Sequence, residues 1–254
     1  MEAKDYLPIA ISVLGFIFSL FATGYSFRHK KYEEERAARA QLNETVGKII
    51  GARIDHAKYL NEHPDVRDNF TTSNVLGSIN YQINSFARLA VYVTERIPQL
   101  VTDIEFAAIA DAFAWTGDQI KAQEYWRAAV SNSKDRHYEI LNRRQFANYL
   151  FTIGDLGAGR DQYKRALELT PVKDDYSKYM TGYTYRMWAV NEAQVGNGKS
   201  ASDHFELAEE AYKTISVEMM RNEAFADLDK MRKFDFKLGM EIKPGALPAG
   251  LPSA

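Results

Sequence analysis

The sequence predicts an all-α fold in which one membrane-spanning helix leads into a stack of helical hairpins. Three observations support this prediction: an uncharged apolar segment near the N-terminus, apolar residues that recur at gaps of three and four, and a threefold repeat marked by glycines. Alternation of apolar and polar residues between turn residues, which would indicate β-strands, is absent.

Composition narrows the function classes. The chain has 254 residues, 46% of them hydrophobic, which excludes disorder over its whole length and allows one or two domains. It has no cysteine, which excludes disulfides, thiolate metal sites and a cysteine nucleophile. Because 32 Lys and Arg nearly balance 34 Asp and Glu, no broad basic surface points to nucleic acid.

The first 31 residues are predicted to be a membrane anchor with a basic flank. No charged residue lies between Asp5 and Arg28, and Leu7–Phe27 would span about 31 Å as a helix, enough for a bilayer core. A cleaved signal peptide is the alternative. Because the first residues are not basic and the apolar run is long for a signal peptide, a retained anchor is favoured.

Flanking charges predict the orientation of this span. Lys4 is the only basic residue before it, whereas five follow: Arg28, Lys30, Lys31, Arg36 and Arg39. Since basic flanks stay in the cytoplasm, we expect the N-terminus outside and the C-terminal domain in the cytoplasm.

Residues 32–102 are predicted to form a juxtamembrane helix followed by a heptad-patterned helix. The first helix carries an apolar face of Leu42, Val46, Ile50, Ile54 and Ala57, and it is expected to break between residues 61 and 72. The second has gaps of three and four along Leu76, Ile79, Ile83, Phe86, Ala90, Val93 and Ile97. This pattern fits either a coiled coil or, as we favour, a helix packed within a helical domain.

Three segments after residue 102 align on Gly117, Gly154 and Gly196. Ala110, Ala147 and Ala189 stand seven residues before these glycines, and Ile109, Phe146 and Trp188 stand eight before. Five residues after them come Ala122, Gly159 and Ala201; nine after, Trp126, Tyr163 and Phe205; twelve after, Ala129, Ala166 and Ala208. A glycine that reverses the chain between two helices with close-packed small residues predicts a helical hairpin, and such hairpins must stack to bury their apolar faces.

This pattern of small and aromatic residues around a Gly-Asp or Gly-Asn turn resembles the tetratricopeptide repeat. The resemblance implies an α-solenoid of about three hairpins, at roughly 103–136, 140–173 and 182–215, whose first helices line a groove. We expect a closing helix at Met219–Leu238 to complete a domain of residues 103–238. The tail, 239–254, is rich in Pro and Gly and is expected to be disordered.

Catalytic motifs are weak. Ala193–Ser200 loosely fits a phosphate loop, but the residues before it read as a helix, whereas such a loop follows a buried strand. The five histidines are scattered and are expected to lie on the surface without binding a metal. We therefore expect a protein that is not an enzyme and needs no cofactor or metal, with nucleotide binding as the least favoured alternative.

The resemblance implies that the groove binds a peptide or protein partner. Candidate groove residues, counted from the turn glycines, are Arg144, Arg186, Asn148, Asp111, Trp115, Tyr183 and Gln194. Arg144 and Arg186 stand ten residues before successive glycines, so they would face one groove and could bind an acidic group. Pairing with internal acids such as Asp111, or plain solvation, is the alternative.

These features predict a membrane-tethered adaptor or scaffold for an unidentified protein or peptide, with no role for nucleic acid. The alternative is a structural membrane protein that forms homo-oligomers. It would use the heptad positions and a stripe of small residues along the span: Ser12, Gly15, Ser19, Ala22 and Ser26.

Overall fold

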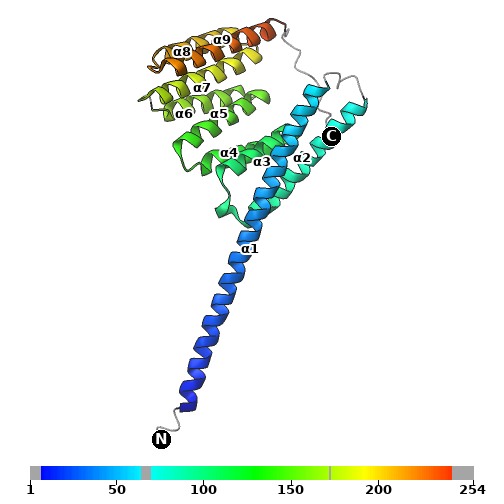
Figure 1. The fold of residues 1–254 in the computed structure, drawn as a ribbon, viewed down its shortest axis with the longest axis vertical. Helices are drawn as coiled ribbons and strands as arrows, with labels where there is room; N and C mark the ends of the chain where they lie inside the picture. The colour runs from blue at the N-terminus through cyan, green and yellow to red at the C-terminus, as the bar shows by residue number, and fades with distance from the viewer. Residues whose placement is uncertain (1–6, 64–69, 172, 242–254) are drawn as a thin grey trace. The chain divides into compact units, whose positions relative to one another are not determined.

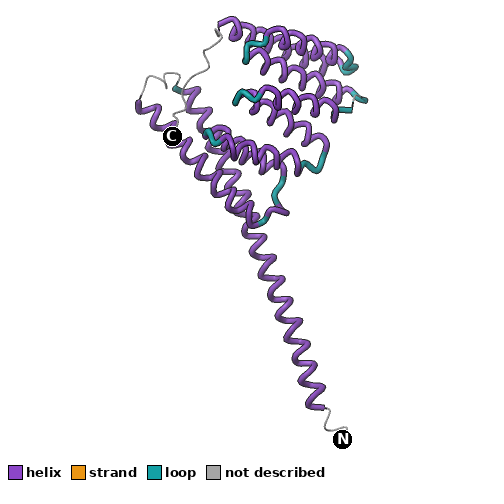
Figure 2. The backbone as a smooth tube through the Cα atoms, turned by 180° about the vertical axis from the view of Figure 1, so that it is seen from behind, coloured by secondary structure: helices purple, strands orange, loops and turns teal. Residues whose placement is uncertain are grey.

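The computed structural model describes residues 7–63, 70–171 and 173–241, with side chains described only outside 7–17, 70–72 and 234–241. Within these ranges the chain is helical and contains no strand, as Figure 2 shows, so the all-α prediction is confirmed. The chain divides into two compact units, Met1–Val101 and Thr102–Ala254.

The first unit is a pair of long helices followed by a short 3-10 turn. Helix α1 covers Leu7–Glu62, α2 covers Phe70–Arg96 and the turn covers Pro98–Leu100. Helix α2 returns alongside the C-terminal half of α1 (Figure 1). The buried apolar residues of the pair are Ala38, Leu42, Val46, Ile49 and Ala52 on α1 and Ile83, Ala87, Ala90, Val93 and Ile97 on α2.

The heptad positions of α2 face inward. All seven, from Leu76 to Ile97, are buried or half-buried, and α2 packs against α1 of the same chain. This confirms the interpretation of the pattern as packing within a helical domain.

The face predicted for the juxtamembrane helix is wrong in its second half. Ile50 and Ile54 are 48% and 61% exposed, whereas Ile49 and Ala52 are buried. Four residues turn an α-helix by about 400°, so each gap of four drifts about 40° around the helix. Residues at successive gaps of four therefore rotate away from the contact with α2, whereas residues at alternating gaps of three and four stay on it.

The predicted membrane span lies inside α1, which runs without a break from Leu7 through Phe27 and beyond. The side chains of residues 7–17, about half of that span, are outside the described residues. Over the described part of the chain, no helix combines the length and the apolar character that crossing a membrane requires.

The second unit consists of three helical hairpins and a final helix (Figure 1). The hairpins are α3 (Asp103–Thr116) with α4 (Gln119–Asn132), α5 (Arg136–Thr152) with α6 (Leu156–Leu169), and α7 (Asp175–Gln194) with α8 (Gly198–Lys213). Each pair packs together, α4 also contacts α5, and α6 contacts α7. Helix α9 (Glu218–Glu241) packs on α7 and α8.

The glycine register of the repeat is confirmed. Gly117, Gly154 and Gly196 have φ angles of 85°, 84° and 81°, a left-handed conformation that glycine adopts without steric cost. The residue after each glycine donates its backbone N–H to a carbonyl of the preceding helix, and the acceptors are Phe113, Leu150 and Glu192. These bonds close each first helix and reverse the chain.

Every small and aromatic position of the repeat is buried. The alanines seven residues before the glycines and those twelve residues after them are fully inaccessible. The aromatic residues nine after the glycines, Trp126, Tyr163 and Phe205, are at most 5% exposed. The pattern thus marks the contact between the two helices of each hairpin.

The C-terminal prediction is right about the helix and wrong about where it ends. Met219–Leu238 lies within α9, but α9 continues through Gly239 to Glu241. A glycine lowers helix propensity by only about 1 kcal/mol, so it does not by itself end a helix. Residues 242–254 of the predicted disordered tail lie outside the described residues.

Candidate functional site

Two arginines from successive hairpins meet at one tyrosine. The guanidinium carbon of Arg144, on α5, lies 4.7 Å from the ring centroid of Tyr183, and that of Arg186 lies 4.6 Å from the same centroid. The two carbons are therefore within about 9 Å of each other. Both contacts are cation–π interactions, and they bring together three of the predicted groove residues.

The repeat places these side chains. Arg144 and Arg186 stand at the same position on the first helices of the second and third hairpins, and α5 contacts α7. Both are buried, with exposures of 4% and 5%. Tyr183 stands one turn before Arg186 on α7 and is half-buried.

Two more tyrosines extend this group, which we call the arginine–tyrosine cluster: Arg144, Arg186, Tyr179, Tyr183 and Tyr212. The ring of Tyr179 lies 6.3 Å from that of Tyr183 and 5.9 Å from that of Tyr212, measured between centroids. Tyr212 is fully buried and comes from α8. Three helices thus contribute to the cluster.

The two arginines differ in their partners. Arg186 forms an ion pair with Asp227 of α9, with 3.2 Å between Nη1 and Oδ2. Among the described residues, no carboxylate lies within ion-pair distance of Arg144, and its Nε and Nη1 atoms are buried without a hydrogen-bond partner. Nε of Arg186 and the hydroxyl of Tyr212 are unpartnered in the same way.

Burial shifts the ionisation of the cluster. It lowers the pKa of Arg144, against the opposite effect of Tyr183 and neighbouring tyrosines, yet a guanidinium keeps its charge at neutral pH. Burial also raises the pKa of Tyr212 above its ordinary value, with Arg186 acting the other way. The side chain of Tyr212 is therefore neutral, and its hydroxyl can donate a hydrogen bond.

This arrangement favours binding of an anion. A buried donor without an acceptor costs about 1–3 kcal/mol, and more when the group is charged. An oxyanion that reached Arg144 would satisfy its free N–H groups in a medium of low dielectric constant, where attraction between charges is strong. A metal cation would be repelled by the arginines, and the described residues contain no group of three potential metal ligands.

The other predicted groove residues are less central. Asn148 is half-buried, one turn beyond Arg144 on α5. Asp111 and Trp115 are exposed on α3. Gln194 is exposed at the end of α7, eight residues or about 12 Å along the helix from Arg186.

Sequence reasoning missed the tyrosines at 179 and 212 and the acid at 227. Tyrosines at 176, 179 and 183, spaced by three and four residues, are a visible signal that this face of α7 is aromatic. Asp227 has no such signal, because it belongs to α9, outside the repeat. Arg186 therefore does pair with an internal acid, which was the alternative to groove binding, but the acid is Asp227 and not Asp111.

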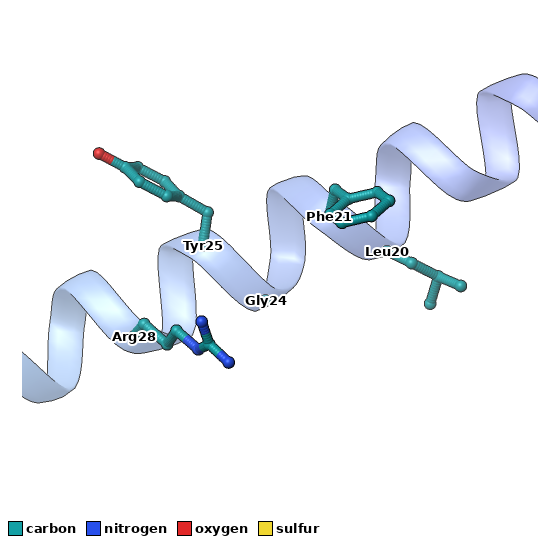
Figure 3. A pocket seen from close by; sticks show the side chains of 5 residues that line it. All are labelled: Leu20, Phe21, Gly24, Tyr25 and Arg28. Carbon is teal, nitrogen blue, oxygen red and sulfur yellow. The ribbon is translucent and has the colours of Figure 1, made fainter.

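A concave area lies along α1, where Leu20, Phe21, Gly24, Tyr25 and Arg28 line it (Figure 3). Every residue described as lining it belongs to this one helix. A single helix cannot enclose a small molecule, so this surface is not a ligand pocket of the usual kind.

The remaining motifs do not form sites. The phosphate-loop-like segment joins the end of α7 to the start of α8, so a helix precedes it where a phosphate loop needs a strand. The prediction that the histidines lie on the surface is wrong for His56, which is 5% exposed. Burial, together with Arg53, lowers the pKa of His56. It lies on the face of α1 that carries Leu42 and Ile49, one turn beyond Ala52.

Comparisons of the chain with models of known families, with curated proteins and with solved structures found no match.

Proposed function

We propose that this protein is a membrane-tethered adaptor whose three hairpins form a tetratricopeptide-like α-solenoid and bind a peptide or protein partner. The support for the solenoid is the recurrence of one buried pattern in three successive hairpins. In this proposal α1 anchors the protein, with the second unit in the cytoplasm.

The observation that best supports the proposal is that Arg144 is buried with unsatisfied hydrogen-bond donors. Its side chain is 4% exposed, yet two of its nitrogens have no acceptor. A buried cation normally has a partner, because desolvation without one is costly. A partner that supplies an acidic group accounts for an arginine held in this way.

Exposed apolar side chains support the tether. Phe18, Leu20, Phe21, Tyr25 and Phe27 are each more than half exposed. At 100° per residue they point to several sides of α1, so a single packed face would not cover them. A helix that is apolar all round is typical of a buried or membrane environment.

The test is affinity capture of the full-length protein from membranes followed by mass spectrometry. Wild type is compared with Arg144→Gln/Arg186→Gln and with Arg127→Gln/Arg165→Gln, in which two exposed arginines of the same unit lose their charge. We expect a partner set that the control variant retains and the first double variant loses at least tenfold.

Partners that bind both double variants equally would refute binding at the arginines. Recovery of only the protein itself, unaffected by either pair of substitutions, would favour the alternative of a structural self-associating protein. Circular dichroism of each purified variant checks that loss of binding is not loss of the helical fold.

A further inference from the structure

We propose that the arginine–tyrosine cluster binds a tetrahedral oxyanion, and that the partner inserts a phosphorylated side chain there. This inference rests on the proposed function, because it names the chemical group that the partner presents. It starts from four buried donors without acceptors: Nε and Nη1 of Arg144, Nε of Arg186 and the hydroxyl of Tyr212.

The number and origin of these donors favour a tetrahedral group over a planar one. They come from α5, α7 and α8, so they approach from three helices. A carboxylate is planar and is satisfied by one guanidinium fork. A phosphate monoester has three free oxygens arranged around a tetrahedral centre, and it can accept bonds from several directions.

Charge points the same way. The cluster holds two guanidinium groups, and the ion pair with Asp227 compensates only Arg186. The carboxylate of Asp227 is 58% exposed, so it can return to water when another anion arrives. Two buried positive charges then match the charge of about −1.5 to −2 that a phosphorylated side chain carries at neutral pH.

Tyr183 is placed to control entry. Its ring contacts both guanidinium groups, and it is half-buried whereas both arginines are buried. Rotation of this ring toward solvent would uncover the space between Arg144 and Arg186. The phosphate would then take over the interactions that the ring now makes with the two cations.

The first measurement uses full-length protein in detergent and inorganic phosphate as the probe. Calorimetric titrations with phosphate and with acetate are made at equal ionic strength. We expect phosphate to bind at least tenfold more tightly than acetate. Equal affinities would overturn the preference for a tetrahedral anion, and absence of phosphate binding would overturn the site.

Two variants locate the site. Arg144→Gln should weaken phosphate binding at least tenfold, whereas Arg165→Gln, an exposed control on α6, should leave the affinity unchanged. Equal weakening in both variants would mean that phosphate binds through general surface charge, which would overturn the proposal.

Arg144→Met separates a ligand-binding role from a structural role. Methionine keeps an unbranched apolar stem and removes the buried charge, which has no carboxylate partner, so the thermal midpoint without phosphate should stay equal or rise. Phosphate should raise the midpoint of wild type and not that of this variant. A midpoint lowered by the substitution, together with an unchanged phosphate response, would show that Arg144 is structural and overturn the proposal.

A final comparison keeps this inference separate from the proposed function. Membranes are treated with a phosphatase before the affinity capture described above, and mock-treated membranes serve as the control. Loss of the Arg144-dependent partners supports a phosphorylated side chain. If the partners stay bound and still depend on Arg144, the adaptor proposal stands and the phosphate inference fails. Phosphate binding with no partner that depends on Arg144 would instead contradict the adaptor.

Discussion

Arg160 and Glu192 join the second and third hairpins through a two-pronged ion pair. Nε and Nη2 of Arg160, on α6, donate to the two carboxylate oxygens of Glu192, on α7, at 2.7 and 2.8 Å. The side chain of Glu192 is fully buried, and it also accepts hydrogen bonds from Trp188 and Asn197. One carboxylate thus links the packing of two hairpins to the turn between α7 and α8.

Glu192→Gln should lower the free energy of unfolding by about 2 kcal/mol, because it removes charge-assisted hydrogen bonds from a buried site. Denaturant titration monitored by circular dichroism measures the loss. Glu168→Gln changes an exposed glutamate of α6 and should have little effect. An equal loss in both variants would contradict the role assigned to the buried carboxylate.

The same ion pair predicts a dependence of stability on pH. Burial alone would raise the pKa of Glu192, but hydrogen bonds from Arg160, Trp188 and Asn197 outweigh it and hold the pKa below its ordinary value. The stabilisation is therefore complete above the ordinary glutamate pKa and is lost as the pH falls through the lowered one. Thermal midpoints of wild type and Glu192→Gln should converge below about pH 4. A gap that stays constant down to acid pH would refute this linkage.

Gly159 is required by a close contact. A Cβ atom at this position would lie 2.6 Å from Cδ2 of Phe151 and 3.3 Å from the carbonyl oxygen of Ala147. Gly159→Ala should therefore lower the free energy of unfolding by about 1–3 kcal/mol, the usual cost of overpacking. Gly157→Ala, where nothing lies within 4 Å of the added carbon, should instead stabilise the helix by several tenths of a kcal/mol. Denaturant titration of both variants tests these two predictions. A loss of stability in Gly157→Ala as large as that in Gly159→Ala would contradict the role of the close contact.

Asp175, at the start of α7, forms hydrogen bonds with the residues that precede α9. Its Oδ2 accepts the backbone N–H groups of Ser216 and Val217 at 2.8 Å each, and Lys178 lies 3.0 Å from its other oxygen. These bonds hold the pKa of Asp175 far below its ordinary value. Asp175→Ala should speed hydrogen exchange at Ser216 and Val217. Equal exchange rates in variant and wild type would contradict this contact.

The contact of Asp175 should also weaken in strong acid. Because the folded-state pKa is lowered, the contact contributes fully above the ordinary aspartate pKa and is lost as the pH falls toward the lowered value. Exchange at Ser216 and Val217, corrected for the intrinsic effect of pH, should therefore stay slow at pH 4. Protection already lost at that pH would argue against a strongly lowered pKa.

The hairpins could be predicted because their packing repeats along the sequence. Each hairpin needs the same small and aromatic residues at the same distance from a glycine, so three copies reinforce one another. The meeting of Arg144 and Arg186 follows from the same register. The ring of Phe151 explains why Gly159 replaces alanine in the second copy, which no pattern could reveal.

Contacts that do not recur in the repeat could not be predicted. Asp227 reaches Arg186 from α9, which lies outside the repeat. At the register position of Tyr212 the other two copies carry Ser133 and Thr170, so no repeated tyrosine marks it. The error at Ile50 and Ile54 has a geometric cause, since gaps of four alone leave the face of a helix. The local periodicity of the sequence therefore predicts the helices, whereas contacts between distant residues are visible only in the three-dimensional structure.

The proposed anchor makes a prediction about Phe18 and Phe21. Both are about three-quarters exposed on α1, so nothing in the described part of the chain covers them, and charged residues there should leave the packing of α1 with α2 intact. In a bilayer, an arginine near the centre of a span costs about 2.5–3.5 kcal/mol on insertion scales. Phe18→Arg/Phe21→Arg should therefore release the protein from membranes in alkaline carbonate, whereas wild type stays in the pellet. Tyr32→Arg, at a position beyond the predicted span that is also more than half exposed, serves as the control and should pellet like wild type. Release of wild type itself, or retention of the double variant, would contradict the anchor.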